Sequence, residues 1–277
     1  MRVDSTYADF PQMADMRKLL EPMQGGPPTI IEILGTPNAG KTMALRKLEN
    51  LLARSGGCRV STIYETASLC PIKTKLDPAY CEWIACETMQ RLLEHMDQGI
   101  ELILCERGLV DVLCWKRFYL NDARISQERY DASLQYILES AVFAAQRFSV
   151  VFTCEPAAAV SREYTGAFRA LAGGQVVNTE ALGRYNQAIA DVLADHRDLL
   201  PRYAALDTTN QIPEETARAL IMAVVGFLGS MHEKRQAALQ APLPCGGAED
   251  AGSLDKTLRQ VLIETATRSF LGNPAKK

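Results

Sequence analysis

Residues 35–42 constrain the fold of this chain more than any other segment. They read Gly-Thr-Pro-Asn-Ala-Gly-Lys-Thr and match the pattern G-x-x-x-x-G-K-[ST]. The apolar run 29–34 precedes them, and an amphipathic stretch from about residue 41 to 54 follows. This order predicts a strand, a phosphate-binding loop and a helix.

The chemistry of such a loop follows from its residue types. Glycines allow backbone N–H groups to turn inward around a polyphosphate, and the helix start adds the positive end of its dipole. Lys41 is expected to reach the β- and γ-phosphates of ATP, and the Thr42 hydroxyl to ligate Mg²⁺. The predicted nucleotide contacts are Gly35, Thr36, Pro37, Asn38, Ala39, Gly40, Lys41 and Thr42. The motif indicates a bound nucleotide but not its use.

The bulk composition excludes several classes of protein. Hydrophobic residues make up 47% of the 277 residues and charged residues 23%, as in ordinary globular domains. A formal net charge of −3 gives no basic footprint, so a nucleic-acid partner is not expected. The sequence shows no apolar run of membrane-span length and no signal-peptide pattern, so we expect no membrane partner and a cytoplasmic location.

The eight cysteines do not form a metal-binding or disulfide pattern. No C-x-x-C pair occurs, and no histidine stands at ligand spacing from Cys81 and Cys86. Cys105 and Cys154 lie inside apolar runs, where cysteine behaves as a small buried hydrophobe. Neither a zinc site nor a disulfide framework is expected.

Short apolar segments alternate with helical ones along the chain. Strands are predicted at 29–34, 59–64, 102–105, 149–154 and 203–206. Helices are predicted at about 41–54, 80–97, 110–119, 127–147, 180–193 and 214–228. This alternation predicts an α/β fold of three layers, with a five-stranded parallel sheet covered by helices on both faces. Ligands of such sheets bind beyond the carboxyl ends of the strands.

Charged residues follow two of the predicted strands at that edge. Glu106 closes the third strand, which is the usual position of an acidic Mg²⁺ ligand acting through water, and Arg107 beside it can pair with an anionic oxygen. Glu65 follows the second strand and can take a proton from an attacking hydroxyl. The alternatives are a surface pair of Glu106 with Arg107 and a solvated Glu65 that opens a loop.

Two arginines follow the fourth strand. Arg162 and Arg169 are seven residues apart, so a helix would place them on one face. A segment with such arginines can close over phosphates and neutralise charge in the transition state, and Gly173, Gly174 and Gly183 offer bending points. The alternative is an ordinary charged helix face.

Together these pieces resemble the P-loop nucleoside and nucleotide kinases, especially the thymidylate kinase and deoxynucleoside kinase branch. The resemblance rests on the 35–42 loop, Glu65, the Cys105-Glu106-Arg107-Gly108 run and the arginine segment, and it covers about residues 29–228. It implies ATP-dependent phosphoryl transfer, with Glu65 as base, Arg107 on substrate or phosphate, and arginines of a helical lid on the transferred group. The acceptor that it implies is a small molecule, a nucleoside or nucleoside monophosphate, and a homodimer is left open.

The chain also departs from that family. Thymidylate kinases usually read Asp-Arg-Tyr/Phe where this chain has Glu106, Arg107 and Gly108. Asp111, one turn beyond Arg107, either binds the acceptor or pairs locally. These departures leave the identity of the acceptor open.

We divide the chain into three parts on this basis. Residues 1–28 form an N-terminal extension with a helix at 9–24, and residues 29–231 form the P-loop kinase-like domain with a lid at about 157–183. Residues 232–277 hold a Pro- and Gly-rich linker at 241–252 and a last helix at 254–270.

Other functions on the same scaffold remain open. One is a kinase of another small molecule or of a polynucleotide end, and another is a regulatory ATP-binding or ATP-hydrolysing switch protein. A kinase needs a second pocket, lined by Glu65 and Arg107, whereas a switch does not. Residues 74–77 imitate the guanine-reading motif of GTPases, but they precede the third strand, whereas a GTPase places the motif after a later one. Residues 171–175 imitate the signature loop of transporter ATPases, but a polar helical stretch follows them and not an apolar strand ending in Asp-Glu.

Overall fold

The structure is a computed structural model that describes residues 13–140, 142–143, 145–165, 179–198, 200 and 202–240. The chain divides into two compact units, Met1–Lys234 and Arg235–Lys277. The second unit begins inside the last described helix, and the candidate site discussed below belongs to the first. The predicted linker at 241–252 and helix at 254–270 lie outside the described residues.

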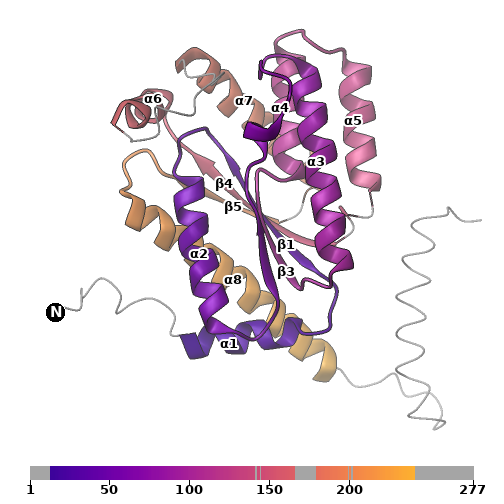
Figure 1. Cartoon of the computed structure of the whole chain (residues 1–277), viewed down its shortest axis with the longest axis vertical. Helices are drawn as coiled ribbons and strands as arrows, with labels where there is room; N and C mark the ends of the chain where they lie inside the picture. The colour runs from indigo at the N-terminus through magenta and orange to yellow at the C-terminus, as the bar shows by residue number, and fades with distance from the viewer. Residues whose placement is uncertain are drawn as a thin grey trace, which may run out of the picture. The chain divides into compact units, whose positions relative to one another are not determined.

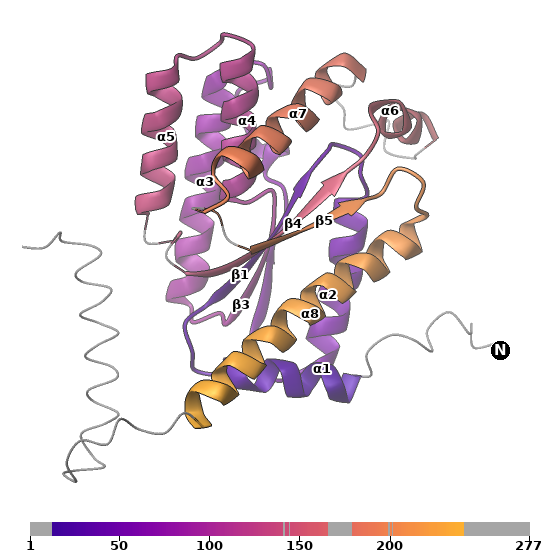
Figure 2. The same ribbon diagram turned by 180° about the vertical axis from the view of Figure 1, so that it is seen from behind.

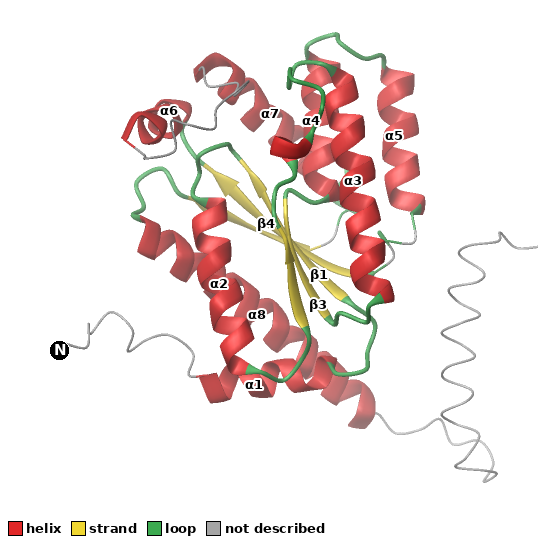
Figure 3. Ribbon diagram, viewed as in Figure 1, coloured by secondary structure: helices red, strands yellow, loops and turns green. Residues whose placement is uncertain are grey.

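A five-stranded parallel sheet forms the centre of the first unit, drawn in yellow in Figure 3. The strands stand in the order β2-β3-β1-β4-β5. Their bounds are β1 Thr29–Gly35, β2 Val60–Ile63, β3 Leu102–Glu106, β4 Gln146–Thr153 and β5 Arg202–Asp207. Every residue of β1 is buried, as expected for the central strand of a parallel sheet covered on both faces.

Helices cover both faces of this sheet (Figures 1 and 2). Ile31 and Ile33 of β1 pack in one core with α1, α2 and the first part of α8, whereas Ile30 and Leu34 pack in a second core with α3, α4, α5 and α7. The bounds are α1 Met13–Leu20, α2 Lys41–Ser55, α3 Pro78–Asp97, α4 Leu109–Asn121, α5 Gln127–Glu139, α6 Pro156–Thr165, α7 Thr179–Asp195 and α8 Pro213–Gln240. The short 3₁₀ helices are η2 Glu21–Met23 and η3 Ala67–Leu69. The predicted fold class is confirmed.

The predicted helix at 127–147 was too long. Helix α5 ends at Glu139, and Ser140 is extended with φ −68° and ψ 142°. The Ser140 hydroxyl accepts a hydrogen bond from the Phe143 backbone N–H at 3.2 Å, which makes a turn. Strand β4 therefore starts at Gln146 and not at 149.

The two ends of the described chain also differ from expectation. The N-terminal helix α1 ends at Leu20 and not at 24 as predicted, and residues 9–12 of the prediction lie outside the described residues. Its Met16 and Leu20 are completely buried in the core formed with α2 and α8. Helix α8 continues to Gln240 and not to 228. In the part of the chain that the structure describes, no helix is long and apolar enough to cross a membrane.

Candidate active site

The phosphate-binding loop joins β1 to α2, as the sequence predicts. Gly35 ends β1 with φ 121°, and a Cβ atom there would lie 1.9 Å from the Phe152 carbonyl oxygen of β4. A side chain is therefore excluded at this position. Gly40, with φ 89°, precedes the first residue of α2 and is also in a conformation that favours glycine.

Lys41 lies inside this loop and is only 4% exposed. Its Nζ donates hydrogen bonds to the carbonyl oxygens of Gly35 at 3.0 Å and Thr36 at 2.7 Å. Burial lowers the pKa of this ammonium group to about 8, and the charge of Arg107 acts in the same direction. An anionic group that entered the loop would favour the charged form of Lys41.

The two predicted metal ligands are in contact. The Thr42 hydroxyl donates a hydrogen bond to Glu106 Oε1 at 2.5 Å, and Glu106 Oε2 accepts one from the Glu65 backbone N–H at 3.4 Å. Among the described residues no group of three or more His, Cys, Asp or Glu side chains could hold a metal ion. A hydroxyl and one carboxylate nevertheless fit Mg²⁺, which usually takes one or two protein oxygens and fills its shell with phosphate and water.

Arg107 is held between two carboxylates at the end of β3. Its Nε lies 2.9 Å from Glu65 Oε1, and its Nη1 donates to Asp111 Oδ2 at 3.3 Å. Burial would lower the pKa of the guanidinium, but the two carboxylates outweigh it and raise that pKa further. The Arg107 backbone has φ 63°, in the left-handed region, which costs on the order of 1–3 kcal/mol in a residue with a side chain.

Glu65 follows β2 and faces two cations. Besides Arg107, the Lys75 ammonium lies 3.9 Å from Glu65 Oε1. Burial would raise the pKa of Glu65, but Arg107 and then Lys75 outweigh it and hold the pKa below its usual value. The carboxylate is therefore ionised at neutral pH and able to accept a proton.

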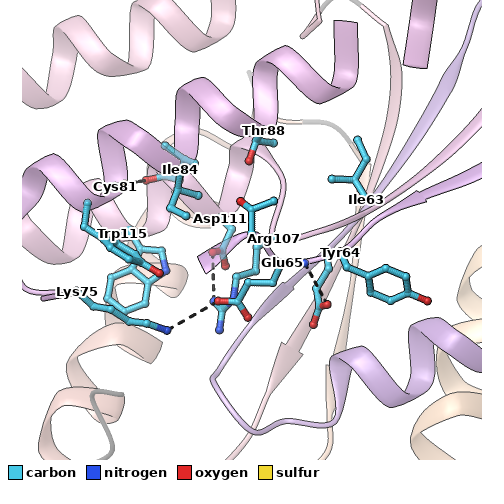
Figure 4. Close-up of a pocket in the computed structure, with 14 residues that line it drawn as sticks. Ile63, Tyr64, Glu65, Lys75, Cys81, Ile84, Thr88, Arg107, Asp111 and Trp115 are labelled. Carbon is cyan, nitrogen blue, oxygen red and sulfur yellow. Dashed lines mark hydrogen bonds and ion pairs between the residues drawn. The ribbon is translucent and has the colours of Figure 1, made fainter. Parts of the chain in front are cut away.

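These charged groups line a cavity beside the phosphate-binding loop (Figure 4). Its charged lining consists of Glu65, Lys75, Glu106, Arg107 and Asp111. Its aromatic and apolar lining includes Ile63, Tyr80, Ile84, Val112 and Trp115. The cavity is therefore charged where β2 and β3 end and apolar between α3 and α4, which suits a ligand with one polar and one flat apolar part.

Asp111 connects this cavity to the loop. Its Oδ1 accepts hydrogen bonds from the Gly35 backbone N–H at 3.4 Å and from the Tyr185 hydroxyl at 2.7 Å. Tyr185, on α7, stacks on Trp115 with ring centroids 4.4 Å apart. Of the two interpretations of Asp111 from sequence, the structure shows local pairing with Arg107, and it adds these two partners.

Arg162, on α6, lies at the other edge of the sheet. Its Nη2 donates to backbone carbonyl oxygens of the loop after β5, those of Thr208, Thr209 and Gln211. Glu65 follows β2, whereas this loop follows β5, so these contacts do not bring Arg162 to the charged cavity. Arg169, Gly173 and Gly174 lie outside the described residues, and Gly183 lies within α7.

Several residues of the site were missed by sequence reasoning. Tyr80 and Trp115 lie within helices and were hidden by the apolar pattern of those helices. Lys75 belongs to the segment that imitates a guanine-reading motif, and its backbone oxygen accepts a hydrogen bond from the Tyr119 hydroxyl at 2.6 Å. Asn186 of α7 was also missed, although its Oδ1 accepts a hydrogen bond from the Thr36 hydroxyl at 2.6 Å.

Comparison with known proteins identifies the fold. No protein-family profile and no curated sequence matches the chain. A solved structure of deoxyadenosine kinase from M. mycoides, with the products dCMP and a flexible dCDP bound, is similar over 71% of this chain and 98% of its own, with a TM-score of 0.53 and 15% identity. A second structure of that enzyme, with dATP bound, gives a TM-score of 0.52 and 14% identity over the same shares. The fold is nucleoside-kinase-like.

Proposed function

We propose that this protein transfers the γ-phosphoryl group of ATP to a nucleoside or a nucleoside monophosphate. The observation that carries the proposal is the cavity lined by Glu65 and Arg107 beside the phosphate-binding loop. A kinase needs such a second pocket for its acceptor, whereas a nucleotide-dependent switch does not. The deoxyadenosine kinase fold supports the same class of acceptor.

The lining of the cavity supports an acceptor that contains an aromatic base. Tyr80 and Trp115 present ring surfaces, and flat rings pack favourably on each other. Glu65 and Arg107 stand at the charged part, where a sugar hydroxyl or a phosphate oxygen would find both a proton acceptor and a cation.

Each of these residues has its own role in an in-line transfer of the phosphoryl group. With a nucleoside as acceptor, Glu65 accepts the proton of the attacking hydroxyl, and Arg107 holds that carboxylate in place. With a nucleoside monophosphate, the attacking oxygen is already anionic, and Arg107 stabilises it. Lys41 neutralises charge on the β- and γ-phosphates, and Thr42 and Glu106 would hold Mg²⁺. When bound, Mg²⁺ supplies further neutralisation of the phosphate charge. Arg162 and Arg169 are proposed to act from the lid, once the segment that bears them closes over the phosphates.

The test of this function measures how strongly each member of a panel of candidate acceptors stimulates the release of ADP from ATP. The panel contains nucleosides, nucleoside monophosphates and short oligonucleotides, and we expect stimulation by members of the first or second group. Stimulation by oligonucleotides only would favour a polynucleotide end as acceptor. Stimulation by none of them, with ATP binding intact, would contradict the proposal and favour the switch.

A further inference from the structure

Glu32 is a charged residue in the middle of the central strand. It is completely buried. Its neighbours Ile31 and Ile33 pack in the core on the other face of the sheet, with α1, α2 and α8. A buried carboxylate is costly unless charged and hydrogen-bonding partners surround it. The proposed catalytic groups do not include Glu32, so its presence there requires another explanation.

The carboxylate of Glu32, on β1, caps the N-terminus of α4, the helix that follows β3. Oε1 accepts a hydrogen bond from the Leu109 backbone N–H at 2.7 Å, and Oε2 accepts one from the Val110 N–H at 3.3 Å. These are the first two residues of α4, whose N–H groups have no partner within the helix. A Cβ atom at Gly108 would lie 2.1 Å from Glu32 Oε1, so the carboxylate occupies the space of a side chain at 108. This explains why glycine follows Arg107 here.

Arg147 of β4 supplies the counter-charge. Its Nη2 donates to Glu32 Oε1 at 2.5 Å and its Nη1 donates to the Val142 carbonyl oxygen at 3.2 Å. Both charged side chains are almost completely buried. A buried ion pair adds little stability over apolar residues of similar size, because its attraction only offsets the loss of hydration. In some proteins such a pair selects one arrangement of the surrounding elements.

We propose that Glu32 is a positioning residue for the phosphoryl transfer proposed above, on which this inference rests. It fixes the first turn of α4 against β1. That turn is joined to Arg107 through Gly108 alone, and it contains Asp111. The Arg107 backbone N–H donates to the Ile33 carbonyl oxygen at 2.9 Å. The left-handed backbone of Arg107 persists only when its surroundings hold it. The Glu32 cap therefore sets where the Arg107 guanidinium meets Glu65 and where Asp111 meets the loop.

The decisive variant removes both buried charges and combines Glu32→Leu with Arg147→Met. It leaves no unpaired charge, so we expect a folded protein, with a thermal midpoint lowered because the Leu109 and Val110 N–H groups lose their acceptor. We expect kcat to fall at least tenfold while the Kd for ATP changes less than threefold, because Arg107 and Asp111 are no longer held. Gly108→Ala, which pushes on the same carboxylate, should lower kcat in the same way and serves if the double variant does not fold.

A matched control separates positioning from stability. Glu101→Gln weakens a buried structural carboxylate, and its kcat should stay within twofold of native although its midpoint falls. A second readout does not need turnover. In a Trp83→Phe background, Trp115 reports on α4 through its stacking on Tyr185, and its emission should change in the double variant.

If the native protein phosphorylates an acceptor, the kcat of the variants decides whether the inference holds. A double variant, or Gly108→Ala in its place, with kcat within twofold of native would overturn the inference. If the native protein phosphorylates no acceptor, the proposed function fails, and the emission of Trp115 decides the role of Glu32. An unchanged emission would then overturn it.

Discussion

The two halves of the candidate site are built in opposite ways. The donor half, Gly35 to Thr42, is one continuous loop, held by the Lys41 side chain on its own carbonyl oxygens and by the Thr36 N–H on the Phe152 carbonyl oxygen of β4. The acceptor half is assembled from the ends of β2 and β3, the loop before α3, and the facing sides of α3 and α4. A continuous loop can be recognised from a short sequence pattern, whereas an assembled cavity depends on the packing of distant elements.

Two sets of contacts join the halves. Thr42 reaches Glu106, which also accepts the Glu65 backbone N–H, and Asp111 accepts the Gly35 backbone N–H. We therefore expect the effect of a substitution in one half to reach the other half through these few hydrogen bonds. The predictions below separate the halves, from the largest expected effect to the smallest.

Lys41→Ala should break the donor half. We expect kcat to fall by about 10³-fold, because a buried cation that neutralises phosphate charge is lost. The thermal midpoint should change little, since the desolvated ammonium contributes little to folding. Lys47→Ala, which removes a surface lysine of the same helix, is the control and should keep native turnover. Native turnover in Lys41→Ala would exclude Lys41 from the reaction.

Glu65→Gln should impair catalysis at the acceptor half and leave ATP binding at the donor half intact. We expect kcat to fall by about 10²-fold, since the proton acceptor is lost, while ATP binding measured by calorimetry is unchanged. Glu87→Gln, in a surface ion pair of α3, is the matched control. Unchanged turnover would eliminate Glu65 as the base.

Arg162→Ala and Arg169→Ala test the proposed lid. Each should lower kcat by about tenfold if the arginines neutralise charge in the transition state. Arg162→Ala should also reduce the free energy of unfolding by about 1–2 kcal/mol, because carbonyl oxygens of the loop after β5 lose their donor. If both variants keep native rates, the lid assignment is wrong.

A carboxylate outside both halves gives the smallest effect. Glu101 accepts hydrogen bonds from the backbone N–H groups of Gly25 at 2.6 Å and Arg59 at 2.8 Å. Burial would raise its pKa, but these donors outweigh it and lower that pKa. Its contribution to stability is therefore complete above the unfolded pKa of about 4.3 and is lost as the pH falls through the lower folded value.

Glu101→Gln should accordingly cost about 1–2 kcal/mol at pH 7 and less at pH 3. Urea unfolding at the two pH values measures the difference. An equal loss at both would show that the charge of Glu101 does not stabilise the fold.

The regular part of the fold could be predicted because each strand is short, apolar and followed by a helical pattern. The prediction failed after Glu139, where the helical pattern of the sequence continues although α5 has ended. Ser140 decides this end through its own side-chain hydrogen bonds, and hydrophobic periodicity does not register such local bonds.

The candidate site could be predicted only where its residues stand at a defined place in the sequence pattern, at the end of a predicted strand. Glu65, Glu106 and Arg107 were found because each follows a strand, at the edge where parallel sheets bind ligands. Tyr80 and Trp115 could not be found, because an aromatic residue in a helix is more often part of a core. Glu32 did carry a signal, since a charge in a strand covered on both faces needs a partner.

The strand order also has a consequence for how the chain folds. β1 pairs with β3 and β4, and each follows it only after intervening helices, so no hairpin can bring them together early. Contacts of such long sequence separation form slowly, because the chain must first close large loops. The candidate site is complete only when β1, which leads into the phosphate-binding loop, is in one sheet with β2 and β3, whose ends line the cavity. Recovery of nucleotide binding after dilution from denaturant should therefore lag behind the recovery of helical signal.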